Sequence, residues 1–426
     1  MNILVIGGGG REHAIIKKLR ENPEVTKLYA CPGNGGIAKD AECVAIGATD
    51  IPALVDFAVE KGIDFCVVAP DDPLALGCVD AMEEKGIPCF GPNKDAAVIE
   101  GSKVFAKNLM QKYGIPTARY EVFSDSVAAL AYIRAQNEFP TVIKADGLAL
   151  GKGVIIAETM AQAEEAVKSI MEDKMFGDSG NRVVVEEFLT GPEVSVLSFT
   201  DGRTIVPMVS SMDHKRALDG DKGLNTGGMG TVAPNPYYTA DVARQCMETI
   251  FLPTVRAMNA EGRTFKGCLY FGLMLTKKGP RVIEYNCRFG DPETQVVLPL
   301  LKTDLFTVMR AVHDGRLAEV PVEFAGGAAA CVVVASGGYP QAYPKGLPIS
   351  LGDAESRADV TVYHAGTTLR DGQLVTSGGR VLGVTATGED LPAALEKAYA
   401  AVREVSFDGA FYRRDIGARA LAALGK

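Results

Sequence analysis

The fold is decided by the stretch Val282-Ile283-Glu284-Tyr285-Asn286-Cys287-Arg288-Phe289-Gly290-Asp291-Pro292-Glu293, which has the pattern of a β-strand running into a polar loop. Successive strand side chains point to opposite faces, so we expect the even-numbered residues from 282 to 288 on one face. The odd-numbered residues from 283 to 289 would then form an apolar, core-facing side. The polar face carries Glu284, Asn286 and Arg288 at intervals of about 6.6 Å.

These three residue types suit a site for metal and phosphate. Carboxylate and amide oxygens are ligands that Mg²⁺ accepts, and arginine matches phosphate or carboxylate with two parallel donors. A surface strand with salt bridges is the alternative that this stretch alone leaves open.

Length and composition indicate a globular protein. The 426 residues suggest roughly two to four domains. Hydrophobic residues make up 47% and charged residues 23% of the chain, which is ordinary for globular proteins. The net charge of −9 argues against nucleic acid as a partner, because such binders need a dominant basic surface.

The nine cysteines form no CxxC pair and mostly lie in apolar runs. This pattern predicts buried free thiols in a reducing compartment rather than disulfides or zinc ligands. The chain enters a strand directly after Met1, without a basic or long apolar leader, and it has no run long enough to span a bilayer. We therefore expect a cytoplasmic protein with no membrane partner.

The N-terminal residues predict a strand, a glycine loop and a helix. An apolar run, Ile3 to Ile6, is followed by four glycines and then by apolar residues at helical spacing, so the helix N-terminus could hold an anion. The dinucleotide fingerprint fails, because Glu12 occupies the position of its third glycine and the strand 27–31 lacks a terminal acid. We interpret the loop as a phosphate cradle without NAD, and a purely structural turn stays open.

The next strand, residues 64–69, is continuously apolar and predicts a buried parallel sheet. It ends in Pro70-Asp71-Asp72-Pro73-Leu74, at the strand end where open α/β sheets bind ligands. This first domain should close near residue 103.

The following segment predicts a flap. Gly101-Ser102-Lys103 starts a helix, and after a helix at 126–136 a strand carries Lys144 into a glycine-rich loop with Lys152. The loop is followed by the strand 154–156 and not by a helix, so it is not a Walker A motif. Such a β-loop-β flap can place backbone N–H groups and a lysine on phosphates. A solvated surface hairpin is the alternative.

The middle of the chain holds two further candidate binding segments. Glu186 to Ser195, between two strands, could form a hinge for an adenine edge, with Glu193 on ribose hydroxyls; a plain turn fits as well. The Asp213-His214-Lys215-Arg216 cluster leads into a glycine-rich stretch, 219–230, which predicts a long functional or disordered loop.

After a helix at 241–261, the strand 268–276 forms a hairpin with the opening stretch. A last domain begins within 324–336, carries Ser377-Gly378-Gly379-Arg380-Val381, and ends in a helix at 391–405 and Arg413-Arg414-Asp415-Ile416-Gly417.

With these segments in this order, the chain resembles the ATP-grasp superfamily and, within it, the glycinamide ribonucleotide synthetase family. The resemblance runs end to end and is carried by the following motifs: Gly9-Gly10-Arg11-Glu12-His13-Ala14, Lys144-Ala145-Asp146-Gly147-Leu148-Ala149, Gly151-Lys152-Gly153-Val154, Asp213-His214-Lys215-Arg216, Asn225-Thr226-Gly227-Gly228-Met229-Gly230, the stretch 284–295 and Asp415-Ile416-Gly417.

The resemblance implies an ATP-dependent ligase that joins glycine to 5-phosphoribosylamine through a glycyl phosphate, in purine biosynthesis. It implies an α/β and α+β multidomain fold, which we expect as an N-terminal open parallel-sheet domain (1–103), an ATP-grasp core (104–325) with a flap subdomain (about 121–194), and a small C-terminal α+β domain (326–426). Its partners would be the small molecules glycine, 5-phosphoribosylamine and ATP, and we expect a monomer.

The resemblance also implies roles for individual residues. Asp213, Lys215 and Arg288 would be catalytic, and Glu284 and Asn286 would bind Mg²⁺ or Mn²⁺. The ATP site would consist of Lys103, Lys144, Gly151, Lys152, Gly153, Glu186, Glu187, Phe188, Leu189 and Glu193. The ribosylamine and glycine sites would consist of Gly10, Arg11, Glu12, Asp71, Asn225, Thr226 and Gly227.

Two departures from the family pattern matter. Ala69-Pro70-Asp71 stands where the family usually has Gly-Pro-Glu, so the acid is one methylene shorter and its contact with the ribosyl substrate is in doubt. The strand 267–276 lacks the additional metal acid that many ATP-grasp enzymes carry, so water and phosphate oxygens must complete the metal shell. A carboxylase of the same fold and a non-catalytic nucleotide sensor are the rival functions.

Overall fold

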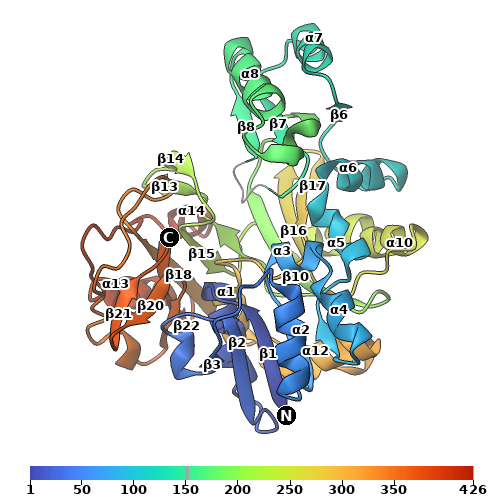
Figure 1. Cartoon of the computed structure of the whole chain (residues 1–426). Helices are drawn as coiled ribbons and strands as arrows, with labels where there is room; N and C mark the ends of the chain where they lie inside the picture. Colours follow the sequence, from blue (N-terminus) through green and yellow to red (C-terminus); the bar gives the residue numbers. More distant parts are fainter. Residues whose placement is uncertain (149–152, 426) are drawn as a thin grey trace.

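The computed structural model describes residues 1–148 and 153–425 (Figure 1). The expected phosphate contacts of Gly151 and Lys152 lie outside the described residues. The described strands form four sheets of four or five strands and two separate hairpins. No helix in this described part is both long enough and apolar enough to cross a membrane.

The N-terminal sheet is parallel and open, as expected. Its central strand pairs on both sides, with Val5 opposite Ala30 and Val67. In spatial order the strands are β3 (Glu42–Cys43), β2 (Lys27–Pro32), β1 (Asn2–Gly7), β4 (Phe65–Val68) and β5 (Cys89–Phe90). Its helices are α1 (Gly10–Leu19), η1 (Ile37–Lys39), α2 (Ile51–Glu60), α3 (Asp71–Ala75), α4 (Cys78–Glu84) and α5 (Lys94–Gly101).

The predicted flap is an antiparallel sheet with its own core, at the top of Figure 1. The expected β-loop-β pairing is present, with Lys144 opposite Val154. The expected helix 126–136 begins where Asp125 accepts the N–H of Ala128 and ends before Asn137 at positive φ. The strands in order are β6 (Tyr120–Phe123), β9 (Val183–Glu187), β7 (Thr141–Ala145) and β8 (Val154–Ala157), with helices α7 (Ser126–Gln136), α8 (Met160–Val167), η2 (Lys168–Glu172) and η3 (Gly177–Asn181). Helix α6 (Lys103–Lys112) precedes the flap and packs against α5.

The central sheet contains the first part of the stretch 282–293. Its strands in order are β11 (Ile205–Pro207), β10 (Glu193–Thr200), β16 (Gly267–Thr276) and β17 (Gly279–Asn286). The helices that accompany it are α9 (Ala240–Cys246), a π-helical segment η4 (Met247–Phe251), α10 (Leu252–Ala260), α11 (Thr294–Val297), η5 (Leu298–Leu300), α12 (Leu305–Asp314) and η6 (Leu317–Glu319).

The predicted alternation along β17 is wrong at its first two positions. Gly272 pairs with Glu284 and Leu273 with Val282, so Ile283 is an extra residue, a β-bulge. The bulge turns Val282 into the apolar core with Tyr285, and it leaves Ile283 beside Glu284 at the pocket. From Glu284 onward the expected alternation holds.

The fourth sheet joins two parts of the chain that are distant in sequence. Its strands in order are β12 (Met212–Asp213), β15 (Gly230–Ala233), β18 (Ala328–Ala335), β22 (Arg380–Gly388) and β19 (Val360–His364). The accompanying elements are hairpin β20 (Thr367–Arg370)–β21 (Gln373–Thr376), η7 (Ala354–Ser356), α13 (Leu391–Val402) and α14 (Ala418–Ala423).

The long loop predicted for residues 219–230 is therefore wrong in part. Residues Arg216–Leu218 (β13) and Lys222–Asn225 (β14) form a hairpin, and β15 follows it. β13 and β14 pair with each other, and β15 pairs with β18, a partner about 100 residues away in the chain that a local pattern does not reveal.

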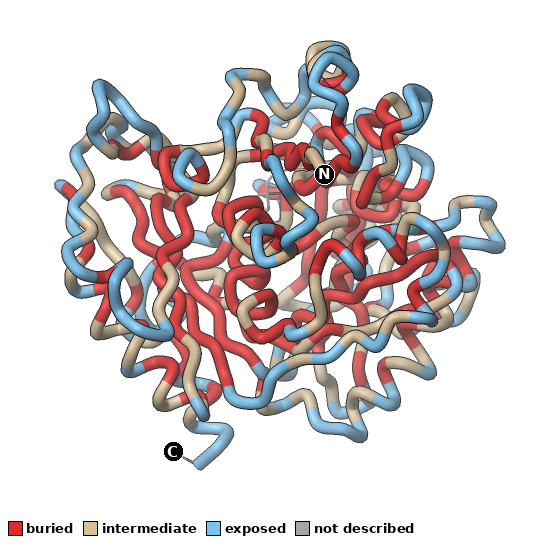
Figure 2. The backbone as a smooth tube through the Cα atoms, turned by 90° about the horizontal axis from the view of Figure 1, so that it is seen from below, coloured by how far each residue is buried: buried red, intermediate tan, exposed pale blue. Residues whose placement is uncertain are grey.

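Buried residues, red in Figure 2, lie mainly in the interior of the molecule, and exposed residues, pale blue, lie mainly on its outside. One apolar core joins Leu4 and Cys66 of the N-terminal sheet with Phe271 and Val282 of the central sheet, so these two units pack directly together. The nine cysteines are all described; none forms a disulfide, and only Cys43 is exposed, as the sequence predicted for buried thiols. The exact domain boundaries stay predictions.

Candidate active site

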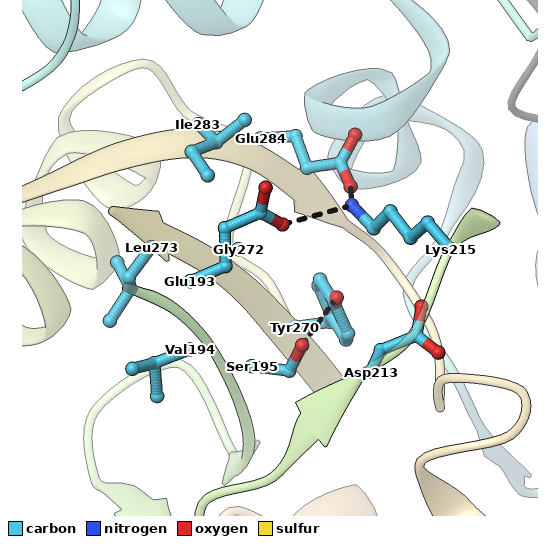
Figure 3. A pocket seen from close by; sticks show the side chains of 10 residues that line it. All are labelled: Glu193, Val194, Ser195, Asp213, Lys215, Tyr270, Gly272, Leu273, Ile283 and Glu284. Atoms are coloured by element: carbon cyan, nitrogen blue, oxygen red, sulfur yellow. Dashed lines mark hydrogen bonds and ion pairs between the residues drawn. The ribbon is translucent and has the colours of Figure 1, made fainter. Parts of the chain in front are cut away.

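A small polar pocket lies where the central sheet meets strand β12 (Figure 3). It brings together four of the predicted site residues: Glu193, Asp213, Lys215 and Glu284. The Lys215 ammonium lies 3.6 Å from Glu284 Oε1 and 3.8 Å from Glu193 Oε2. One cation thus bridges an expected metal ligand and an expected ribose acid that are 91 residues apart in the chain.

The charges in this pocket keep each other ionised. Glu284, above all, raises the pKa of Lys215 well above its ordinary value. Burial by itself would raise the pKa of Glu284, but Lys215, Lys144 and Lys103 lower it below the ordinary value. The pocket therefore offers an ionised carboxylate surrounded by lysines, which suits a cation and phosphate groups together.

Asp213 belongs to a second, more buried group of acids. Tyr270 Oη donates to Glu293 Oε1 at 3.2 Å and lies 2.8 Å from Ser195 Oγ. Burial, and after it the charge of Glu293, raises the pKa of Asp213 well above its ordinary value. Burial also raises the pKa of Glu293. A bound ammonium group would stabilise the ionised form of Asp213, as its expected role toward glycine requires.

Arg288 follows the end of β17 and is held from helix α5. Its Nη2 lies 3.0 Å from Glu100 Oε1, and Glu100 Oε2 accepts the N–H of Cys287 at 2.8 Å. With the Asn286 amide turned so that both of its groups are paired, its nitrogen also donates to Glu100 at 3.0 Å. Glu100 thus fixes the end of the candidate metal strand, a role that the sequence did not predict because Glu100 is far from it in the chain.

The expected phosphate lysines lie under the flap. Lys144 is buried, 3.1 Å from Glu186 Oε1, and donates to Ile283 O at 3.1 Å. Lys107, which the sequence did not single out, lies 3.2 Å from the other Glu186 oxygen. Burial lowers the pKa of Lys107 to about 8. The side chain of Glu186 therefore neutralises two lysines, and its backbone carbonyl accepts from the hydroxyl of Thr141 at 3.2 Å, so the polar groups of Glu186 are already paired within the flap sheet.

Lys103 lies at the base of the flap. It starts helix α6 and donates to Gly147 O at 2.7 Å. Asp146 Oδ1 accepts from Ser102 Oγ at 2.9 Å and from the N–H of Val104 at 3.1 Å. These bonds connect the loop that leads into the flap to the N-terminus of α6. In the same region the N–H of Ala145 donates to Gly153 O at 2.8 Å.

The rest of the expected hinge is more open. Glu187 Oε1 accepts the N–H of Arg119 at 2.8 Å. Phe188 is exposed and Leu189 half-buried, just before Glu193 at the start of β10. The hinge thus presents an apolar, accessible surface between the flap and the central sheet.

The expected phosphate cradle at helix α1 already contains carboxylates. Glu12 Oε2 accepts the N–H of Gly9 at 2.6 Å, and Asp291 Oδ2 accepts the N–H of Arg11 at 3.3 Å. Gly10 begins the helix, while Arg11 donates to Glu12 Oε1 at 2.8 Å. Glu12 is buried and organises this loop. Asp71 begins helix α3, and it is among the acids that, after Glu100, raise the pKa of Arg288.

The expected substrate loop, Asn225 to Gly227, receives support from the C-terminal sheet. The N–H and the hydroxyl of Thr226 both donate to Lys215 O at 2.8 Å. Arg380 Nη1 donates to Gly227 O at 2.9 Å and to Asp291 O at 2.8 Å, and Gly227 N–H donates to Tyr339 Oη at 3.1 Å. Arg380 stands in a glycine-rich segment that the sequence analysis noted without assigning a role.

The fold and this pocket define an ATP-grasp enzyme. Models of the N domain, the ATP-grasp (A) domain and the C domain of phosphoribosylglycinamide synthetase match residues 1–100, 101–294 and 329–419. The chain belongs to the phosphoribosylglycinamide synthetase family.

Individual relatives agree with the family models. A phosphoribosylamine–glycine ligase of Caldanaerobacter subterraneus is 47% identical over 98% of this chain and 100% of its own. The crystal structure of a phosphoribosylamine–glycine ligase from Thermotoga maritima superposes with a TM-score of 0.85 at 35% identity, covering 98% of this chain and 100% of that one.

The biotin carboxylase domain of a 2-oxoglutarate carboxylase from Hydrogenobacter thermophilus shares the fold alone, with a TM-score of 0.75 at 16% identity over 96% of this chain and 91% of that one. That structure contains MgADP and bicarbonate.

The present chain is a ligase of purine biosynthesis that makes glycinamide ribonucleotide from glycine and 5-phosphoribosylamine with ATP.

Proposed function

We propose that ATP lies between the flap and the central sheet, with its phosphates toward Lys103, Lys144 and the pocket of Glu284. The single observation that supports this most is the convergence of Lys103, Lys144 and Lys215 on Glu284, each of which lowers its pKa. Lys144 also pairs with Glu186 and Lys215 with Glu193, whereas Lys103 donates to the neutral carbonyl of Gly147, so its charge in particular is available to the phosphates of a nucleotide.

Glu284 and Asn286 would hold the metal ion. The donor set fits Mg²⁺, which usually takes one or two carboxylates and completes its shell with water and substrate phosphates. In residues 1–148 and 153–425, no group of three or more histidines, cysteines or acids is arranged to hold a metal, so a protein-only cage is absent from this part. Mg²⁺, or Mn²⁺ with the same preference for hard oxygens, would neutralise phosphate charge when bound.

The remaining residues would bind and orient the two other substrates. A glycine carboxylate oxygen attacks the γ-phosphorus and ADP leaves, which gives glycyl phosphate; the amine of phosphoribosylamine then attacks the acyl carbon, loses a proton, and releases phosphate. Lys144 and Arg288 would offset the charge of the transferring group, and Asp213 would bind the ammonium of glycine. Closure of the flap would exclude water from the acyl phosphate.

Phosphoribosylamine would lie between helix α1 and the loop 225–227. Arg11, Asp71, Gly227 and the neighbouring backbone would contact it. The phosphate of phosphoribosylamine would have to compete with Glu12 and Asp291, which accept the N–H groups of Gly9 and Arg11. We therefore expect the Arg11 side chain to move from Glu12 toward the ligand. We also propose that the protein acts as a monomer in the cytoplasm and binds no nucleic acid.

An assay of phosphate release with each substrate omitted in turn tests this proposal. We expect release to require ATP, glycine, phosphoribosylamine and a divalent cation together. Bicarbonate in place of glycine should give none; release with bicarbonate would favour a carboxylase. Tight ATP binding without any release that depends on glycine and phosphoribosylamine would instead favour a nucleotide sensor and contradict the proposal.

A further inference from the structure

The hairpin β13–β14 connects the two halves of the candidate substrate site. It begins directly after Asp213 and Lys215 and ends at Asn225, where the loop 225–227 starts. Residues 222–225 are all exposed, and in β13 the one buried residue is the small Ala217, so apolar packing contributes little to holding the hairpin in place. Its position must come from polar contacts.

Those contacts come from the C-terminal segment 413–417, which the sequence analysis noted as a motif without assigning it a function. Arg413 is only 2% exposed and is the largest fully buried side chain in the described part of the chain. Its guanidinium makes a two-pronged bond to Asp415, with both distances 2.8 Å. It also donates to Arg216 O at 3.1 Å and to Asp221 Oδ1 at 2.9 Å, both on the hairpin.

Further bonds connect the same two segments. Asp415 Oδ2 accepts the N–H of Gly220 at 2.9 Å, and Asp219 Oδ1 accepts the N–H of Arg414 at 2.8 Å. The contacts therefore run in both directions, from hairpin to segment and from segment to hairpin. Charge-assisted, two-pronged bonds of this kind fix geometry more strongly than single neutral ones.

His214, which stands between the two candidate catalytic residues, is held by the same segment. Its Nε2 accepts the N–H of Gly417 at 3.1 Å, and its Nδ1 faces Gly230 O at 3.1 Å. An imidazole that accepts at Nε2 must carry its proton on Nδ1, so it donates to the Gly230 carbonyl. The backbone on either side of His214 is thereby fixed between strand β15 and the segment 413–417.

We propose that Arg413 is a positioning residue for the ligase reaction, which acts through Asp221 and the hairpin to hold Asp213, Lys215 and the loop 225–227 in register. This inference rests on the proposed roles of those residues. Lys103, Lys144 and Glu186 make their contacts within the flap, helix α6 and the central sheet. Of the residues that the hairpin holds, Lys215 also reaches the ATP side of the pocket, through Glu284 and Glu193 at 3.6 and 3.8 Å. Loosening the hairpin should therefore impair the use of glycine and phosphoribosylamine much more than that of ATP, whose contacts with Lys103 and Lys144 stay in place.

Asp221→Asn is the most informative variant. Asp221 has φ of +54°, a left-handed conformation that asparagine tolerates well, and it is partly exposed, so the change removes a charge without straining the turn. Arg413→Lys is the second variant, because lysine cannot form the two-pronged bond. Asp359→Asn is a matched control: Asp359 has φ of +60° and an ion pair to Lys397, but it lies outside these contacts. Arg414→Ala removes an exposed neighbouring arginine.

Steady-state kinetics with each substrate varied, and thermal unfolding, give the readout. We expect Asp221→Asn and Arg413→Lys to lower kcat/KM for glycine about tenfold or more, because small displacements of positioning groups have effects of this size. The KM for ATP should stay within about twofold of the controls. A change of stability alone would not produce this split between substrates.

Either of two results would overturn the proposal: kcat/KM for glycine within about twofold of the controls in both variants, or an equal rise of the KM for ATP. Lys215→Met, assayed with the same substrates, distinguishes failure of the role proposed for Arg413 from failure of the site assignment. Loss of activity in Lys215→Met with normal hairpin variants overturns the role of Arg413 alone. Full activity in Lys215→Met overturns the site assignment together with it.

Discussion

The Glu100 carboxylate lies 3.0 Å from the guanidinium of Arg288 and thereby ties the end of helix α5 to the end of strand β17. The same carboxylate accepts the N–H of Cys287. Both charged groups are largely buried. A buried ion pair of this kind fixes the direction of the arginine, and removing one partner leaves the other charge uncompensated.

We expect Glu100→Gln to lower kcat/KM about 10²-fold, because Arg288 would lose the charge that orients it. The melting temperature should also fall. Glu84→Gln, on the neighbouring helix α4, is the control, since Glu84 is exposed. Kinetics of Glu100→Gln equal to those of Glu84→Gln would show that Arg288 does not depend on Glu100.

Arg288→Ala tests the proposed contact with the transferring phosphoryl group. Loss of one charged donor from a dry site typically costs about 10²–10³ in rate, and we expect a fall of kcat in that range. The KM for ATP should change less, since the adenine and the other phosphates have separate partners. A loss of under about threefold would argue against a role in the transition state.

Glu284→Gln tests the metal site. The amide keeps the shape of the side chain but loses the charge that a divalent cation requires, so turnover that depends on Mg²⁺ should disappear. Binding of Mn²⁺ to the enzyme–ADP complex, followed by electron paramagnetic resonance, gives a readout that is independent of activity and should weaken strongly.

Glu165→Gln, on the exposed face of α8, is the control for the metal experiment. Unchanged Mn²⁺ binding, or unchanged activity across a Mg²⁺ titration, would contradict the assignment of Glu284 as a ligand.

The elements that the sequence predicted correctly are those whose signals are local. The helix 126–136 has its own aspartate cap, and β4 is a short run of apolar residues that must be buried on both faces. The bulge at Ile283 has no such signal, because it depends on how β17 pairs with β16. A shift by one residue there reversed the predicted faces of Val282 and Ile283.

The residues of the candidate site also divide into those with a local signal in the sequence and those without one. Glu284 and Lys144 could be predicted because a motif surrounds each of them. Glu100 and Arg380 could not, since their partners lie 188 and 89 residues away in the chain. The strands β12 and β15 were missed for the same reason: they belong to a sheet whose other strands are β18, β22 and β19, which lie far away in the chain.

Two buried histidines should make the fold sensitive to mild acid. His13 Nδ1 accepts the N–H of His364 at 2.8 Å, so its proton is on Nε2, 3.0 Å from Asp40. His214 is also neutral, because its Nε2 accepts the N–H of Gly417 and its Nδ1 donates to Gly230 O. Burial, chiefly, lowers the pKa of each from 6.5 to about 4.

The direction of the effect follows from this lowering. The unfolded chain takes up protons at these histidines near pH 6.5, whereas the folded chain does so only near pH 4. Their contribution to stability is therefore complete above pH 6.5 and is lost as the pH falls toward 4, with an upper bound of about 3 kcal/mol for each histidine. Acids whose pKa is lowered, such as Glu355 at about 2, act in a separate and more acidic window.

Chemical denaturation between pH 7.5 and 4 measures this effect. Buried acids whose pKa is raised, such as Asp213 and Glu293, take up protons in the folded chain and act in the opposite direction, so the contribution of a histidine is measured as a difference between variant and wild type. We expect the free energy of unfolding of His214→Gln to start lower at pH 7 but to fall less steeply than that of the wild type, because one proton is no longer taken up on unfolding. His313→Gln, at a partly exposed histidine on helix α12, is the comparison variant for a histidine outside these buried contacts. Equal slopes for His214→Gln and the wild type would show that His214 is protonated in the folded protein.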